Sequence, residues 1–200
     1  MIAIIDYGAG NLFSVKNALD YLGIESQITD DGGQIAKADG VILPGVGAFP
    51  DAMRMLTNQG LKPAVLEAAG EKPFLGICLG MQMLFDEGRE FETVPGLGLI
   101  DGYVDRLQTQ KLKIPHMGWN ELRYQNPCEL LEGIEEGEYV YFVHSFMAYT
   151  RDENIAAYCD YDQKVTALVQ RGYVFGAQFH PEKSGETGLM MLKNFARLTK

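Results

Sequence analysis

A cysteine stands between two glycines in the stretch FLGICLGMQMLF, residues 74–85. Cys78 has Gly76 two positions before it and Gly80 two positions after it. This spacing follows the pattern G-x-nucleophile-x-G, in which a sharp turn from a strand into a helix exposes the nucleophile above a sheet edge. Glycines let the chain double back there without side-chain collisions. The pattern indicates a nucleophilic cysteine, and a packing cysteine in a glycine-rich turn remains the alternative on this stretch alone.

The residues on either side of Cys78 predict the elements that such a turn needs. Residues 73–77 predict a buried strand that leads into the turn, and residues 79–88 predict the helix that leaves it. The N-terminus of that helix would favour a thiolate. The backbone N–H of Leu79 would be available to an oxyanion formed at the attacked carbon.

The segment QFHPE, residues 178–182, supplies a candidate base. His180 and Glu182 are two positions apart, so in an extended chain they face the same side, and Pro181 restricts the backbone between them. A carboxylate on one imidazole nitrogen fixes the tautomer and leaves the other nitrogen to serve a thiol. His-Pro-Glu alone is often only a turn. Together with Cys78, the segment predicts a nucleophile, a base and an orienting carboxylate.

The composition argues against several other functions. The chain has 200 residues and 46% hydrophobic content, which fits one domain over residues 1–200. Its 17 basic and 27 acidic residues give a net charge of −10, whereas nucleic-acid and membrane-surface binding need a basic footprint. No signal peptide or transmembrane segment is predicted. We expect neither nucleic acid nor a membrane among the partners.

The cysteines and glycines predict no bound metal or cofactor. The three cysteines, at positions 78, 128 and 159, are too widely spaced for a disulfide framework or a metal knuckle, and a reduced, cytoplasmic setting is expected. The segment GAGN, residues 8–11, lacks the third glycine of a dinucleotide fingerprint, because Phe13 occupies that place.

Short apolar runs alternate with helical patterns in the first half of the chain. This alternation predicts a mostly parallel sheet covered on both faces. Strands are expected at 2–6, 25–29, 39–45 and 73–77, and helices at 11–23 and 51–70. The second half is β-rich, with strands expected at 96–107, 113–122, 138–146, 154–162, 165–170 and 173–181, and an amphipathic helix expected at 185–200. The sequence predicts an α/β fold with a mixed, mostly parallel sheet.

The segments GICLGMQ and FHPEKS together resemble the class I (triad) glutamine amidotransferases. The likeness extends over essentially the whole chain and implies the flavodoxin-like three-layer fold of that family. It implies that Cys78, His180 and Glu182 hydrolyse the side-chain amide of L-glutamine and that the ammonia passes to a synthase. No metal or organic cofactor is implied.

The segment LPGVGAF, residues 43–49, resembles the oxyanion strand of that family. The resemblance implies that the N–H groups of Gly45, Val46 and Gly47 join that of Leu79 around the oxyanion. Without a partner motif, PGVG is more often an ordinary strand-exit turn.

The segment YFVHSF, residues 141–146, resembles the part of the family that holds glutamine by its backbone. The resemblance implies a glutamine-binding role for His144, Ser145 and Phe146, with no catalytic role for His144. Gln82 lies one helical turn after Cys78 on the same predicted face, so it could reach the substrate. A helix-surface filler is the alternative at that position, and the family likeness favours glutamine binding.

The segments PHMGWN, residues 115–120, and DYGAGN, residues 6–11, narrow the likeness to the glutaminase subunits of histidine biosynthesis. The resemblance implies a separate partner polypeptide, a (β/α)₈-barrel cyclase, in a heterodimer. Asn11, Trp119 and Lys183 are the predicted contact residues. We further expect the strand around Val46 to become correctly poised only when the partner carries its ligand.

Three other interpretations remain open at the level of the sequence. The first is a glutaminase subunit of another synthase, such as that of pyridoxal phosphate synthesis. The second is a cysteine hydrolase or stress-type protein of similar fold, in which a histidine commonly follows the elbow cysteine, where this chain has Leu79. The third is a binding domain without enzymatic activity.

Overall fold

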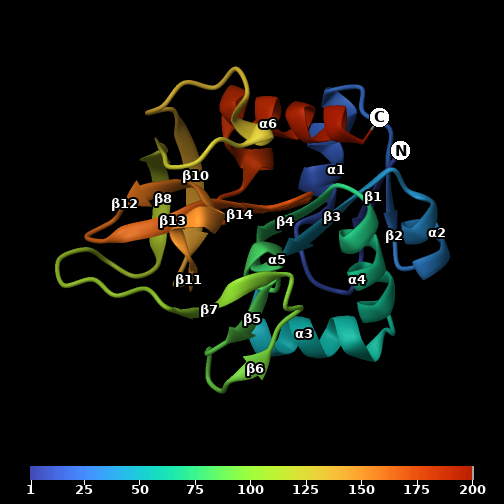
Figure 1. Ribbon diagram of the computed structural model, residues 1–200, viewed down its shortest axis with the longest axis horizontal. Coiled ribbons are helices and arrows are strands. Elements are labelled where there is room, and N and C mark those ends of the chain that lie inside the picture. The colour runs from blue at the N-terminus through green and yellow to red at the C-terminus, as the bar shows by residue number, and fades with distance from the viewer. Residues whose placement is uncertain (200) are drawn as a thin grey trace.

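An eight-stranded mixed sheet runs through the centre of the computed structural model, which describes residues 1–199 (Figure 1). The strand order is β2-β1-β3-β4-β14-β13-β12-β9. Neighbours from β2 to β14 run parallel, and those from β14 to β9 run antiparallel. The strands are β1 (Ile2–Ile5), β2 (Ser26–Thr29), β3 (Gly40–Gly45), β4 (Phe74–Cys78), β9 (Arg123–Tyr124), β12 (Ile155–Asp160), β13 (Lys164–Arg171) and β14 (Val174–Ala177). This sheet confirms the predicted fold class.

Helices cover both faces of the parallel part of the sheet. Figure 1 shows α1 and α6 above it and α3 and α4 below it. The helices are α1 (Leu12–Tyr21), α2 (Gly32–Lys37), α3 (Phe49–Asn58), α4 (Lys62–Glu71) and α6 (Gly185–Leu198). Ile2 and Ile4 of β1 pack in one core cluster with α1 and α6, whereas Ala3 and Ile5 pack in another with α2, α3 and α4. Burial on both faces explains the uninterrupted apolar run that predicted this strand.

Two smaller sheets make up the β-rich second half. A four-stranded sheet has the order β11-β7-β5-β6, and a two-stranded ribbon pairs β10 with β8. Their strands are β5 (Phe85–Gly88), β6 (Val94–Pro95), β7 (Ile100–Arg106), β8 (His116–Glu121), β10 (Tyr139–His144) and β11 (Phe146–Tyr149). The short helical turns are α5 (Leu79–Gln82), η1 (Glu129–Leu131), η2 (Asp152–Asn154) and η3 (Pro181–Lys183).

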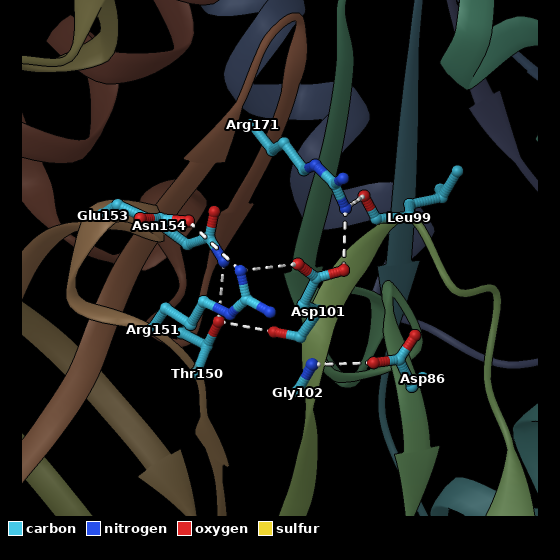
Figure 2. Close-up of polar contacts among 9 residues, drawn as sticks. All are labelled: Asp86, Leu99, Asp101, Gly102, Thr150, Arg151, Glu153, Asn154 and Arg171. Carbon is cyan, nitrogen blue, oxygen red and sulfur yellow. Dashed lines mark hydrogen bonds and ion pairs between the residues drawn. The ribbon is translucent and has the colours of Figure 1, made fainter.

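A polar cluster ties the four-stranded sheet to the central sheet (Figure 2). Asp101 of β7 accepts a hydrogen bond from Arg171 of β13 at 3.1 Å and lies 3.8 Å from Arg151. Within the four-stranded sheet, Gly102 N donates to Asp86 Oδ2 at 2.9 Å. These ion pairs are partly exposed, so each contributes at most about 1 kcal/mol to stability.

The helix predicted at 79–88 is wrong beyond its first turn. Only residues 79–82 are helical, in α5, and residues 85–88 form strand β5. Phe85 pairs with Ile100 of β7, and a side chain on Gly88 would collide with the ring of Phe49 at 2.5 Å. The run MQMLF is buried on all sides, so it lacks the periodicity that separates a helix from a strand.

Other predicted elements also differ from the structure. The helix predicted at 51–70 is two helices, α3 and α4, because Gly60 with φ +72° follows the first and turns the chain. The strand predicted at 138–146 is interrupted at Ser145, where the chain passes from β10 to β11. Helix α2 was not predicted. Residue 200, the last of the predicted helix 185–200, lies outside the described residues.

Within residues 1–199, no helix is long and apolar enough to cross a membrane.

Gly80 provides a direct test of the packing around the cysteine turn. A Cβ at this position would lie 1.8 Å from the carbonyl oxygen of Leu43, which is backbone and cannot rotate away. We predict that Gly80→Ala lowers the free energy of unfolding by at least about 2 kcal/mol in urea denaturation. Gly70→Ala is the matched control, because Gly70 is exposed in α4 with open space at its Cβ, and it should raise stability by roughly 0.5 kcal/mol. Equal stability of the two variants would contradict the packing described here.

Candidate active site

Cys78 occupies a strained turn at the end of β4. Its φ of 55° and ψ of −111° lie outside the regions that non-glycine residues favour. A Cβ on Gly76 would lie 2.6 Å from the carbonyl oxygen of Gly80. A Cβ on Gly80 would itself collide with Leu43 of β3. The two glycines flank the cysteine because the returning chain packs directly against strands β3 and β4.

The thiol of Cys78 lies in a largely buried, weakly bonded position. The residue is 7% exposed. Its Sγ atom lies 3.9 Å from Gln178 Nε2 and 4.0 Å from the carbonyl oxygen of Val143. Since α5 is a single turn, any dipole effect on the thiol comes from a few N–H groups rather than from a long helix.

His180 and Glu182 form a buried pair, as predicted, but by a different local geometry. His180 Nδ1 lies 2.8 Å from Glu182 Oε1, and the side chains are 2% and 1% exposed. The prediction of a continuous extended segment is wrong, because Glu182 lies in the 3₁₀ turn η3 while His180 alone is extended. The turn closes through a 2.9 Å bond from Lys183 N to the carbonyl oxygen of His180. It brings the carboxylate back onto the imidazole ring.

The surroundings of His180 favour its protonated form. Burial alone would lower the pKa of this ring, but the neighbouring Cys78 and Glu182 outweigh that effect and raise the pKa to about 9. Nε2 is buried with no hydrogen-bond partner among residues 1–199, and Cys78 lies close enough to raise the pKa of the ring. A pKa raised in this direction favours the imidazolium form of the ring near neutral pH. It favours a thiolate at Cys78 and has a proton to give to a leaving group.

A cavity of about 400 Å³ joins Cys78 and His180 to most of the other predicted site residues. It is lined by Val46, Gly47, Cys78, Leu79, Gln82, Glu90, Pro115, Val143, His144, Ser145, Phe146 and His180. Gly45 does not line it, but pairs in register with Cys78 across β3 and β4. A volume of this size suits a small molecule such as an amino acid.

Two predicted glutamine-binding side chains converge on one backbone carbonyl. Gln82 Nε2 donates to the carbonyl oxygen of Phe146 at 3.0 Å, and His144 Nδ1 lies 2.8 Å from the same atom. Gln82 Nε2 also donates to Gln178 Oε1 at 3.0 Å, so only its own Oε1 remains for a ligand. These two contacts hold the carbonyl group of Phe146 in place, and residues 144–146 line the cavity.

Two residues that line or support the cavity were missed in the sequence. Glu90 is the only acidic residue of the cavity wall, and its Oε2 accepts a hydrogen bond from Phe49 N at 2.8 Å. Nothing in the sequence separates Glu90 from the other acidic residues of 86–92. Gln178 is fully buried and links Gln82 to Cys78, and the available signal was a polar side chain directly after the apolar run of β14.

The three predicted partner-contact residues lie outside the cavity wall. Trp119 of β8 is 55% exposed and stands edge-on to Tyr141, with ring centroids 6.0 Å apart. Lys183 is exposed in η3, and Asn11 is half-buried just before α1. All three are accessible from the surface.

A second, larger hollow of about 950 Å³ lies around Tyr124, Cys128 and Gln170. It contains no histidine, and burial raises the pKa of the Cys128 thiol to about 12. Burial likewise raises the pKa of Cys159 to about 12. The larger of the two hollows is therefore not the candidate active site. Within residues 1–199, no group of three His, Cys, Asp or Glu residues is placed to hold a metal ion.

Comparison with known proteins agrees with this geometry. The family model described as glutamine amidotransferase class-I matches residues 3–198. The imidazole glycerol phosphate synthase subunit HisH of Bacillus cereus (strain G9842) is 52% identical over 196 residues, which cover 98% of this chain and 93% of that protein. The subunit of the same name from Listeria monocytogenes serovar 1/2a is 48% identical, covering 100% and 96%.

A solved structure described as a glutamine amidotransferase superimposes with a TM-score of 0.77 at 20% identity. The alignment covers 100% of this chain and 99% of that one. At this identity the similarity concerns the fold.

The raised pKa of His180 predicts a pH dependence of folding. A group whose pKa is higher in the folded state stabilises that state fully below its ordinary pKa and loses the effect as the pH rises through the folded value. The wild-type protein should therefore lose stability between pH 6.5 and about 9. Glu182→Gln should lower the pKa of His180, since an adjacent opposite charge changes a pKa by about 1 to 3. The variant should therefore lose less stability over this pH range than the wild type.

The measurement is the free energy of unfolding in urea across that pH range. Imidazole NMR titration of His180 would accompany it. Glu186→Gln, at an exposed position of α6, removes a carboxylate that does not contact the ring and should retain the wild-type profile. The assignment of Glu182 would be contradicted if both variants lost stability with pH as the wild type does.

Proposed function

Because the chain belongs to the class-I glutamine amidotransferase family, we propose that it is the glutaminase subunit of an imidazole glycerol phosphate synthase in histidine biosynthesis. The observation that carries the proposal is a cysteine on a strained turn facing a buried His180–Glu182 pair across one small cavity. Relatives that span nearly the full chain at about half identity carry that subunit name.

In the proposed first step, the Cys78 thiolate attacks the side-chain amide carbon of glutamine. The carbonyl electrons move to oxygen, and the N–H groups of Leu79 and of residues 45–47 stabilise the oxyanion. Removing one donor of this kind typically lowers kcat by about 10²- to 10³-fold. The His180 imidazolium then gives its proton to the departing nitrogen, and ammonia and a γ-glutamyl thioester result.

In the second step, neutral His180 accepts a proton from water as the water attacks the thioester. The thiolate leaves, glutamate is released, and the ring is an imidazolium again. Glu182 holds Nδ1 throughout, so that Nε2 keeps facing the reacting atoms.

Glu90 is the proposed partner of the substrate's α-ammonium group. It is the only acidic side chain on the cavity wall, and its bond to Phe49 N fixes its position. The segment 144–146 forms the wall beside it and holds the rest of the glutamine through its backbone.

The ammonia requires a receiving enzyme close to the site. Ammonia is mostly protonated near neutral pH and is then a poor nucleophile, so release into solvent would waste glutamine. We propose that a separate (β/α)₈-barrel cyclase subunit docks at Asn11, Trp119 and Lys183. That subunit would use the ammonia to form imidazole glycerol phosphate and an aminoimidazole carboxamide ribotide.

The oxyanion strand is the proposed point of control by the partner. Val46 is 45% exposed and lines the cavity with Gly47, and a Cβ on Gly47 would meet no atom within 4 Å, so there is space for this segment to move. A ligand-loaded cyclase could therefore select the conformation in which the N–H groups point at the oxyanion.

The direct test is glutamate release from glutamine by the chain alone, with the cyclase, and with the cyclase plus its nucleotide ligand. We predict strong stimulation only with the loaded cyclase and a loss of at least about 10³-fold in Cys78→Ala. Equal turnover with and without the loaded cyclase would eliminate the proposed control. No glutamate release under any of these conditions would eliminate the glutaminase itself.

A charge-neutral substitution tests the role of Glu90. Glu90→Gln keeps an oxygen acceptor for Phe49 N but removes the negative charge, so KM for glutamine should rise roughly 10- to 100-fold. Glu92→Gln changes an exposed neighbour and should leave KM unchanged. Similar KM values for the two variants would reject an ion pair between Glu90 and the substrate.

A further inference from the structure

Two buried histidines that the proposed chemistry does not use share one hydrogen bond. His116 of β8 and His144 of β10 are paired in register across the ribbon. They are 3% and 6% exposed, and His116 Nδ1 lies 2.9 Å from His144 Nε2. One of these nitrogens must donate and the other must accept, so the tautomers of the two rings depend on each other.

The bonds around Asn120 determine whether the neighbouring nitrogen of His116 carries a proton. Glu121 N donates to Asn120 Oδ1 at 2.9 Å, and Asn120 Nδ2 donates to the carbonyl oxygen of Asp160 at 3.0 Å. The amide orientation is fixed by these two bonds. Its nitrogen therefore faces His116 Nε2, at 3.3 Å, and that ring nitrogen must be an unprotonated acceptor.

The carbonyl group of Phe146 determines which nitrogen of His144 carries a proton. A carbonyl can only accept, so His144 Nδ1, at 2.8 Å, carries the proton. In a neutral ring, His144 Nε2 is then bare, and His116 Nδ1 donates to it. Only one tautomer pair satisfies every bond, with the proton on Nδ1 of both rings.

Both rings must also be neutral. A proton added to His116 Nε2 would face the Asn120 amide N–H, and one added to His144 Nε2 would face the N–H of His116. Burial lowers the pKa of both histidines to about 4, in agreement with this requirement.

We infer that His116 is a positioning residue for glutamine binding: it holds His144 in the Nδ1–H tautomer, and His144 then clamps the Phe146 carbonyl that shapes the cavity wall at 144–146. The inference rests on the proposed function, because it concerns the segment assigned to glutamine. Without the His116 donor, His144 Nε2 would be a buried acceptor with no partner, which favours moving the ring proton from Nδ1 to Nε2. Its bare Nδ1 would then face the carbonyl oxygen, two acceptors would repel each other, and the segment would shift.

The chain of bonds lies directly beneath the surface proposed for the cyclase. Alternate residues of a strand face opposite sides, so His116 and Asn120 point inward from β8 while Trp119 points outward. The ribbon thus carries the proposed partner contact on one face and the support of the glutamine-binding segment on the other.

The tautomers can be read in the wild-type protein without any substitution. The chain has three histidines, so ¹⁵N-labelled histidine gives a simple long-range ¹H–¹⁵N NMR spectrum. We expect His116 and His144 both to show a protonated Nδ1 and a bare Nε2 at neutral pH. His116→Phe would identify the His116 signals by their loss. A protonated Nε2 on either ring would overturn the inference.

Two substitutions separate the donor of His116 from its packing. The His116 ring stacks on Phe142 and Tyr161, with centroids 4.6 and 4.0 Å apart. His116→Phe retains an aromatic ring for this stacking but removes the donor, whereas His116→Asn retains a donor near the position of Nδ1 but removes the ring.

The kinetic measurement is glutamate release in the complex with the ligand-loaded cyclase. We expect KM for glutamine to rise on the order of 10-fold in His116→Phe, with kcat within about 3-fold, because the segment contacts glutamine before and during reaction. His116→Asn should keep KM within about 3-fold of wild type despite a lower thermal stability. An unchanged KM in His116→Phe would overturn the inference. So would KM values that rise with the loss of thermal stability in both variants, whether or not the donor is present.

The outcomes also separate this inference from the proposed function. A wild-type protein that releases no glutamate with the loaded cyclase would reject the function, whatever the tautomers are. An active wild type with a fully functional His116→Phe variant would reject only the role of His116. If His116→Asn does not fold, the NMR measurement of the tautomers in the wild-type protein still tests the role of His116.

Discussion

The close approach of the cysteine turn to strand β3 is the constraint on which the rest of the site depends. Gly76, Gly80 and Gly45 each lie where a Cβ would meet neighbouring atoms at 2.9 Å or less. Only a chain without side chains at these places can hold Cys78 at a positive φ and bring the PGVG segment beside it. The nucleophile and the proposed oxyanion donors therefore occupy neighbouring strands by the same packing.

The topology places the base at the same sheet edge. Strand β14 inserts next to β4 and runs parallel to it, so the chain leaves both strands at their carboxyl ends. Cys78 is the last residue of β4 and His180 follows β14, although about a hundred residues separate them in the sequence. The β-rich segment between them adds the cavity wall at 144–146. This wall is where β10 ends and β11 begins, so two different sheets hold it.

The sequence predicts the features that depend on local spacing, and misses those that depend on tertiary contact. The cysteine turn and the His180–Glu182 pair follow from residues two positions apart, and the parallel sheet follows from apolar runs. Strand β5 could not be predicted, because an evenly buried run such as MQMLF has no periodicity. Glu90 and His116 gain their roles only from side chains distant in sequence: Phe49 N and the cavity in one case, His144 in the other.

In the proposed reaction, Cys78 carries the glutamyl group as a thioester. The most direct measurement is intact-mass spectrometry after acid quenching of the enzyme during turnover of glutamine with the ligand-loaded cyclase. We expect a covalent adduct equal to the mass of glutamine less ammonia. It should map to the peptide that contains Cys78 and disappear in Cys78→Ala. Turnover with no adduct at any quench time, or an adduct on Cys128 or Cys159, would contradict it.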